Sequence, residues 1–217
     1  MKVREDKKLI IFDVDGVLLD GKLGGFKDIL ALLGKREKVE IIDEEYQRRK
    51  HKGPWGLEQL AALYKGYSQG KLTKTAERYC RKNLVPGAKE TIPVLKKQGY
   101  LVGAISSSPQ FILQVLKNSL TLNFIEGTKL EFSNDAATGK MTRKVDRYQK
   151  ARILEEKKQQ LDLETEQITV VGDSITDLPM AKEAGRFIAF NAKKPAAEKA
   201  NAVINQKDLK ILLEIIK

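Results

Sequence analysis

Two aspartates separated by one residue follow the first apolar run of the chain. Residues 8–14 read Lys-Leu-Ile-Ile-Phe-Asp-Val, and Asp15 and Gly16 come next. In an extended chain residues i and i+2 point the same way, so the Asp13 and Asp15 carboxylates are expected to face one pocket. Gly16 allows the backbone to turn closely around a bound group. Two carboxylates in one pocket can hold a hard cation or exchange protons with a substrate.

Polar groups also follow two later apolar runs. The run 168–171 is followed by Gly172, Asp173 and Asp177, and the run 101–105 is followed by Ser106, Ser107 and Ser108. In an open α/β sheet ligands bind beyond the carboxyl ends of the strands, so these three ends are expected to converge. The hydroxyls and the backbone N–H groups ahead of a helix that starts near Pro109 would form an anion site.

Acids clustered beside an anion site predict phosphoryl transfer that depends on a divalent cation. Mg²⁺ prefers a few carboxylates together with water and phosphate oxygens. Without a cation the carboxylates would repel the phosphate and one another. A single Asp-x-Asp pair is more often a strand that ends in an acidic turn. The ordered set is more specific, because the aspartate pair, Ser106, a lysine and the later acids occur in turn.

The apolar runs alternate with helical patterns, which predicts an α/β fold with a Rossmann-like, mainly parallel sheet. Strands are expected at 8–14, 101–105, 168–171 and 186–190, and helices at 87–98, 110–116, 148–160, 178–184 and 207–216. Residues 20–84 contain no convincing buried strand and predict a helical cap domain inserted into a core of residues 1–19 and 85–217. A β-hairpin or flap is expected within 124–142, around Asn134-Asp135.

The composition predicts a soluble protein with a charged surface. Hydrophobic residues make up 41% of the 217 residues and charged residues 32%, with a formal net charge of +11. The basic residues are interleaved with acids along the chain, so no nucleic-acid partner is expected. No apolar stretch is long enough for a membrane span, and the charged start of the chain does not resemble a signal peptide, so we expect a cytoplasmic location. A single cysteine excludes an intrachain disulfide. The oligomeric state is not indicated.

The ordered set resembles the haloacid dehalogenase superfamily of phosphotransferases. Asp13-Val-Asp-Gly-Val17 is similar to its first motif, Ser106 to the second, Lys150 to the third, and Gly172-Asp-Ser-Ile-Thr-Asp177 to the fourth. Nearly the whole chain is covered, and the greatest likeness is to the phosphoserine phosphatase group, in which a helical cap follows the first motif. The resemblance implies a Mg²⁺-dependent phosphoric monoester hydrolase that acts on a small phosphorylated metabolite.

The resemblance also implies a role for each motif residue. Asp13 would attack phosphorus, and Asp15 would protonate the leaving oxygen and later activate water. Asp13, the Asp15 backbone carbonyl and Asp173 would hold Mg²⁺. Ser106, the Ser107 amide and Lys150 would contact the phosphoryl oxygens, and Asp177 would support the metal site or orient Lys150. Lys140 and Lys144 are alternatives to Lys150, although both fall nearer the expected hairpin.

The likeness does not extend to the residues that would recognise serine. Lys22 stands where the phosphoserine phosphatase group carries an acid, residues 57–62 contain no arginine, and Thr176 replaces an asparagine. A lysine at this place would repel an ammonium group and attract an anion. The natural substrate is therefore expected to be a more anionic phosphomonoester than phosphoserine.

Several residues of the predicted cap are candidates for a substrate pocket. They are Lys22, Tyr46, Arg48, Arg49, His51 and Trp55. Each has a plainer interpretation, because the aromatic residues could form the core of the cap and the basic ones its solvated surface.

Two other functions remain open at the level of sequence. A phosphomutase or other phosphotransferase of the same superfamily would retain both Asp13 and Asp15. A non-enzymatic, polyanion-binding protein would account for the charge but has no need of Asp15. A carbon–halogen hydrolase of the superfamily is expected to lack the second aspartate, and Asp15 argues against it.

Overall fold

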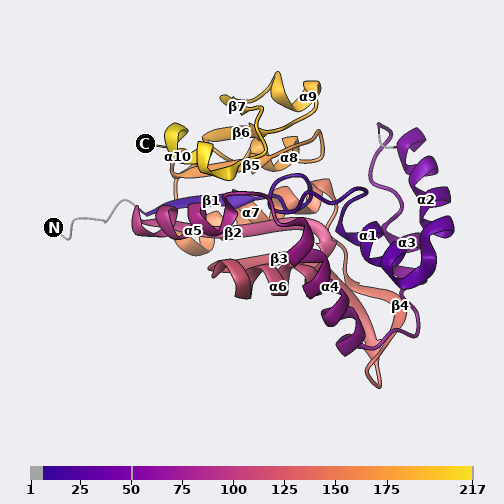
Figure 1. Cartoon of the computed structure of the whole chain (residues 1–217). Coiled ribbons are helices and arrows are strands. Elements are labelled where there is room, and N and C mark those ends of the chain that lie inside the picture. Colours follow the sequence, from indigo (N-terminus) through magenta and orange to yellow (C-terminus); the bar gives the residue numbers. More distant parts are fainter. Residues whose placement is uncertain (1–6, 50, 217) are drawn as a thin grey trace.

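A computed structural model describes residues 7–49 and 51–216 (Figure 1). Within this part of the chain, seven strands form one sheet in the order β4-β3-β2-β1-β5-β6-β7. β4 pairs antiparallel with β3, and all other neighbours are parallel. The strands are β1 (Lys8–Phe12), β2 (Tyr100–Pro109), β3 (Phe124–Ser133), β4 (Ala136–Arg143), β5 (Ile168–Gly172), β6 (Arg186–Phe190) and β7 (Ala202–Ile204). The predicted α/β class is confirmed.

Helices cover both faces of the sheet (Figure 1). In β1, Ile10 and Phe12 belong to a hydrophobic cluster with α5 (Ala88–Lys97) and α6 (Gln110–Leu120), whereas Leu9 and Ile11 belong to a second cluster with α7 (Arg147–Leu161). Burial on both faces explains why β1 after Lys8, and β5 apart from Thr169, are apolar instead of alternating. The helices are α1 (Gly25–Leu30), η1 (Ala31–Lys35), α2 (Arg36–Arg49), α3 (Leu57–Leu63), α4 (Gln69–Asn83), α5 (Ala88–Lys97), α6 (Gln110–Leu120), α7 (Arg147–Leu161), η2 (Thr165–Gln167), α8 (Leu178–Ala181), α9 (Lys194–Ala197), η3 (Leu209–Ile211) and α10 (Leu212–Ile215).

Some predicted element boundaries are wrong. The strand expected at 101–105 continues to Pro109 through a register shift against β3, so the serines lie in the strand and not after it. The closing helix expected at 207–216 is a short 3-10 turn followed by one turn of α-helix. The edge strand β7, with three residues, is too short to give a period-two pattern and was not predicted.

The segment between β1 and α5 consists of α1 to α4 with η1. Of these helices, α1, α2 and α3 lie beyond one end of the sheet, whereas α4 packs beside α6 (Figure 1). Its two ends run side by side. The Asp20 N–H donates to the Asn83 carbonyl at 2.8 Å, and the Val85 N–H donates to the Leu18 carbonyl at 3.0 Å. The division into a cap of residues 20–84 and a core of 1–19 and 85–217 stays a prediction, and residues 1–6, 50 and 217 lie outside the described residues.

The hairpin expected within 124–142 is present as β3 and β4. Asn134 and Asp135 connect the strands with φ angles of 47° and 64°, as a two-residue turn of primed type requires. The hairpin end also pairs with the loop between α3 and α4. The Gly66 N–H donates to the Ala137 carbonyl at 2.8 Å, and the Ala137 N–H donates to the Tyr67 carbonyl at 2.9 Å. Backbone hydrogen bonds therefore attach the helical segment to the sheet at a second place.

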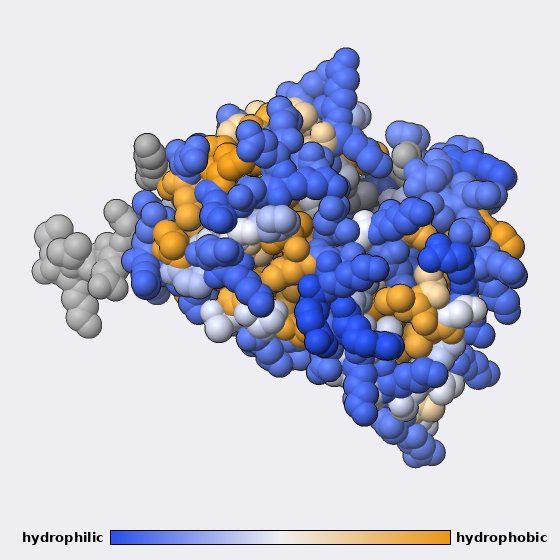
Figure 2. Space-filling model, viewed as in Figure 1, coloured by the Kyte–Doolittle hydropathy of each residue, from blue (hydrophilic) through white to orange (hydrophobic). Residues whose placement is uncertain are grey.

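Most of the surface seen in Figure 2 is hydrophilic, with apolar residues in separate patches. This agrees with a charged and solvated surface. Among the described residues, no helix has the length and apolar character that a membrane crossing requires.

Tyr64 joins the helical segment to the sheet domain from inside the core. Its side chain is fully buried, and its hydroxyl donates to the Phe26 carbonyl at 2.8 Å. Its ring makes edge contacts with Phe26 and with Phe111 of α6, with centroids 5.6 and 6.0 Å away. Such a residue contributes both buried area and a hydrogen bond to the junction.

We expect Tyr64→Ala to lower the free energy of unfolding by roughly 3–5 kcal/mol, because a large buried side chain is lost. Tyr64→Phe should lower it by about 1 kcal/mol, because the Phe26 carbonyl loses its donor. Urea unfolding followed by circular dichroism measures both. Tyr148→Phe, at an exposed tyrosine, is the control. Equal stability of Tyr64→Phe and the wild type would show that the hydroxyl contributes nothing.

Candidate active site

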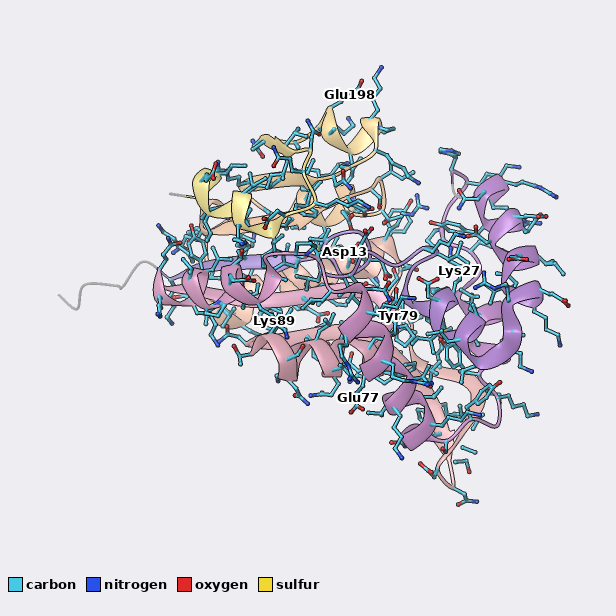
Figure 3. All side chains as sticks on the ribbon, viewed as in Figure 1. Asp13, Lys27, Glu77, Tyr79, Lys89 and Glu198 are labelled. Atoms are coloured by element: carbon cyan, nitrogen blue, oxygen red, sulfur yellow. The ribbon has the colours of Figure 1, made fainter. Side chains whose placement is uncertain are left out.

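The carboxyl ends of β1, β2 and β5 meet at a cavity of about 460 Å³ between the sheet and the helical segment. Figure 3 labels Asp13 on the sheet side and Lys27 on the helical side. The motif residues that line the cavity are Asp13, Asp15, Gly16, Ser106, Ser107, Lys150, Asp173, Ser174 and Thr176. The expected convergence of three strand ends is therefore present.

Asp13 is fixed by the sheet and by its own neighbour. Its backbone N–H continues the ladder by donating to the Val171 carbonyl at 2.9 Å, and its Oδ1 accepts from the Val14 N–H at 2.7 Å. The side chain is buried, and burial together with the nearby Asp177 carboxylate raises its pKa well above the ordinary value. The Lys150 ammonium, 3.0 Å from Oδ1, opposes that increase.

Lys150 is a buried cation held between two carboxylates. It lies in the first turn of α7, which is capped by the Asp146 side chain. Its Nζ is 3.0 Å from Asp13 Oδ1 and 2.8 Å from Asp177 Oδ1, and these two acids hold its pKa above the ordinary value despite its burial. Of the three candidate lysines, Lys144 instead pairs with Glu58 at 2.8 Å, and Lys140 is exposed. The described contacts favour Lys150 as the third-motif lysine.

Asp177 organises the loop after β5. It is fully buried, and its Oδ2 accepts from the backbone N–H groups of Asp173 and Ser174, both at 3.1 Å. Gly172 leaves room for this packing, because a Cβ there would lie 2.7 Å from the Asp177 Cβ. Gly16, with a φ of +83°, lets the first loop pass beside Asp173, since a Cβ would lie 2.3 Å from its Oδ2.

Asp15 is held differently from Asp13. Its Oδ1 accepts from the Gly25 N–H and its Oδ2 from the Ser108 hydroxyl, both at 2.7 Å. Burial raises the pKa of Asp15, and the hydrogen bonds from Ser108 and Gly25 oppose that increase. The carboxylate therefore faces the start of the helical segment, not Lys150. Sequence reasoning placed Ser108 among the anion donors and missed this contact.

Ser106 and Ser107 lie where an anion could be bound. Ser106 is 1% exposed, and its Oγ accepts from the Ser108 N–H at 3.2 Å. Ser107 is half-buried and lines the cavity. Both belong to the irregular part of β2, where the register against β3 shifts.

Three acids lie close enough to share a cation. Carboxylate oxygens of Asp13, Asp173 and Asp177 all lie within 4.8 Å of one another. Burial and the neighbouring Asp177 raise the pKa of Asp173 to about 7. Neighbouring carboxylates repel one another when ionised, and a bound cation would relieve that repulsion. Carboxylate oxygens are also the hard donors that Mg²⁺ prefers. The predicted metal set includes Asp15 through its backbone carbonyl, which stays a prediction; the Asp15 carboxylate accepts hydrogen bonds from Gly25 and Ser108.

The cap candidates divide into two groups. Lys22, Tyr46 and Trp55 line the cavity. Arg49 is not among its lining residues; it lies over the Trp55 ring at 5.4 Å and pairs with Glu45. The other exposed candidates, Arg48 and His51, are likewise absent from the lining.

Sequence reasoning missed further residues on the cavity wall. Lys27 pairs with Asp43 at 2.5 Å and lies over the Tyr46 ring at 5.2 Å, so α1 and α2 are tied together beside the cavity. Arg147 and Lys193 add positive charge from the sheet side. These residues come from unrelated segments, and only the fold brings them together.

The comparison with known proteins gives the family. Residues 7–185 match the family model of the haloacid dehalogenase-like hydrolases. The chain belongs to the haloacid dehalogenase-like hydrolase family. Within this family it falls in the phosphoserine phosphatase group. It is 32% identical to the phosphoserine phosphatase of Archaeoglobus fulgidus over 98% of the chain, and it spans 60% of that relative's length. It is 31% identical to the phosphoserine phosphatase of Methanocaldococcus jannaschii over 99% of the chain and all of the relative.

A solved structure of this family has the same fold. It is described as a phospho-aspartyl intermediate analogue of phosphoserine phosphatase, and it aligns with a TM-score of 0.83 at 30% identity over 97% of this chain and 99% of its own. The predicted membership of the haloacid dehalogenase superfamily, in the phosphoserine phosphatase group, is confirmed.

The raised pKa values of Asp13 and Asp173 predict how the stability of the metal-free protein depends on pH. Because these carboxyls bind protons more tightly when folded, stability falls as the pH rises. For Asp173, whose folded pKa is about 7, this loss extends through the interval from pH 6 to pH 8. We expect a loss of roughly 1 kcal/mol over this interval. Mg²⁺ needs ionised ligands, so its addition should raise the melting temperature more at pH 8 than at pH 6.

Thermal melts at pH 6, 7 and 8, with EDTA or with Mg²⁺, measure this effect. Asp173→Asn is the matched variant, and it should flatten the pH dependence and abolish the Mg²⁺ increment. A Mg²⁺ increment that is the same at pH 6 and pH 8, or absent at pH 8, would contradict the assignment.

Proposed function

We propose that this protein is a Mg²⁺-dependent phosphatase that hydrolyses a small phosphomonoester through an aspartyl-phosphate on Asp13. The observation that carries the proposal is the buried Asp13–Lys150 ion pair, with Asp15 and Asp173 on the same cavity wall. The ion pair holds the attacking oxygen, and positioning and charge neutralisation are the main requirements of phosphoryl transfer.

In the first step an Asp13 carboxylate oxygen attacks phosphorus, and the bond from phosphorus to the leaving oxygen breaks. Asp15 gives its proton to that oxygen, and burial, which raises the pKa of Asp15, favours the protonated form that this step requires. Lys150 offsets charge on Asp13 and the phosphoryl oxygens, while Ser106 and the Ser107 amide donate to those oxygens.

In the second step the Asp15 carboxylate takes a proton from water, and the water oxygen attacks phosphorus. The bond between Asp13 and phosphorus breaks, which frees the carboxylate and releases inorganic phosphate. Asp15 ends the cycle protonated, as it began.

Asp13, Asp173 and the Asp15 backbone carbonyl would hold Mg²⁺, with Asp177 positioning the loop of Asp173 and orienting Lys150. The bound ion would supply positive charge that lets the phosphate approach this acidic wall.

Asp13→Asn should lower phosphate release by roughly 10³-fold or more, because an amide cannot serve as the nucleophile. Acid quenching with a ³²P-labelled phosphomonoester should trap labelled wild-type protein but no labelled variant. Asp135→Asn, at the exposed hairpin turn, is the control. Retention of activity by Asp13→Asn would refute the proposal, and transfer of label to an added alcohol in preference to water would favour a phosphotransferase.

The proposed substrate carries extra negative charge and no ammonium group. Lys22 is exposed and lines the cavity, where it would repel an ammonium group. The nearby Asp20 does not replace the missing acid, because it pairs with Lys207 at 2.8 Å. Lys193 and Arg147 add further positive charge to the wall.

The wild type should therefore hydrolyse 2-phosphoglycolate with a higher kcat/KM than phosphoserine. Lys22→Glu should shift the ratio of the two kcat/KM values towards phosphoserine by about tenfold, which corresponds to an interaction of about 1.4 kcal/mol with an exposed charge. Lys89→Glu, on α5 and away from Asp13 in Figure 3, is the control for net charge. A wild-type preference for phosphoserine would refute this substrate class.

A further inference from the structure

The Asp15 carboxylate is held from two sides of the cavity. Ser108 of β2 donates its hydroxyl to Oδ2, and Gly25 at the start of α1 donates its backbone N–H to Oδ1, each at 2.7 Å. One donor comes from the sheet and the other from the helical segment. Together they fix both the position of Asp15 and the plane of its carboxylate.

Ser108 is itself rigidly placed. It is 1% exposed, and its backbone N–H donates to the Ser106 Oγ at 3.2 Å. It lies in the irregular part of β2, between Ile105 and Pro109, where the register against β3 shifts. The irregular backbone aims this hydroxyl at Asp15, 93 residues away in the sequence.

A hydroxyl suits a residue that changes its protonation state. It can donate to a carboxylate and accept from a carboxylic acid, so the contact persists in both forms. A charged group in its place would favour one form strongly, and an apolar group would leave a buried carboxylate oxygen without a partner.

The nearby Asp28 does not compete for this contact. Its carboxylate accepts from the Tyr79 hydroxyl at 3.0 Å and from the Leu23 N–H at 3.2 Å. It therefore holds the loop at the start of α1 instead of approaching Ser108.

We propose that Ser108 is a positioning residue that orients Asp15 for proton transfer to the leaving group. The inference rests on the proposed function, in which Asp15 protonates the leaving oxygen. Ser108 acts through Asp15, and its hydroxyl is not required to bind the phosphoryl group.

If Ser108 positions Asp15 for proton transfer, its loss should affect substrates differently according to the basicity of their leaving groups. A residue that only stabilises the fold would affect all substrates alike. A weakly basic leaving group, such as p-nitrophenolate, departs without a proton. Phenolate is more basic, so its departure depends more strongly on protonation. Loss of the Ser108 hydroxyl should therefore slow phenyl phosphate more than p-nitrophenyl phosphate. kcat/KM reports only the steps up to release of this group, so the later use of Asp15 as a base does not enter.

The experiment compares Ser108→Ala with the wild type on both aryl phosphates in the presence of Mg²⁺. We expect kcat/KM to fall by roughly 10–100-fold for phenyl phosphate, within the range of general acid catalysis. For p-nitrophenyl phosphate we expect a fall of no more than about threefold, because its leaving group needs little acid assistance. Ser119→Ala, an exposed hydroxyl on α6, is the matched control and should change neither value.

Two further variants separate positioning from damage to the fold. Ser108→Thr keeps the hydroxyl and should recover most of the phenyl phosphate activity. In an Asp15→Asn background, Ser108→Ala should cause no further loss on phenyl phosphate, since the acid that Ser108 positions is already absent.

Equal losses on the two substrates, or no loss on either, would overturn the inference. That outcome is distinguishable from failure of the proposed function. If Asp13→Asn is inactive and unlabelled while Ser108→Ala behaves as the wild type, only the role of Ser108 is wrong.

Discussion

The candidate site depends on the ion pairs between the buried Lys150 ammonium and the Asp13 and Asp177 carboxylates. Burial of charge is unfavourable unless the charge is paired and hydrogen-bonded. Here the pairing is incomplete, because Asp173 adds a third carboxylate to one ammonium. Burial, followed by the excess of negative charge, raises the pKa values of Asp13 and Asp173. A divalent cation at this place would offset that excess of negative charge.

Each charged group of the site is positioned by a regular element of the fold. Asp13 and Asp173 follow neighbouring central strands, whose parallel pairing brings their carboxyl ends together. Lys150 comes from the first turn of α7, which packs on the face of the sheet formed by Leu9 and Ile11. The packing of α7 against this face therefore fixes the position of the Lys150 ammonium relative to the Asp13 and Asp177 carboxylates. A cation–acid pair with this geometry needs no flexible loop to assemble it.

Much of this could be predicted from sequence, and the rest depended on tertiary contacts. The strand ends at Asp13 and Asp173 carry strong local signals, because buried parallel strands are apolar throughout and end in polar residues. The role of Ser108 and the Lys27–Asp43 pair had no such signal, since their partners lie far away in the chain. The continuation of β2 through the serines was missed because a register shift replaces the period-two pattern. Arg49 was predicted from its type and neighbourhood, but its side chain pairs with Glu45 and lies over the Trp55 ring.

The backbone pairing between the β3–β4 hairpin and the loop after α3 links two parts of the chain that sequence reasoning treated as separate. Strand-like pairing has a fixed register, so an insertion or deletion in the hairpin would carry the loop, and α3 with it, along the same direction. Leu57 and Leu60 of α3 form part of the cavity wall. The length of the hairpin therefore sets where α3 lies at the cavity, although none of the described residues that line the cavity belongs to the hairpin.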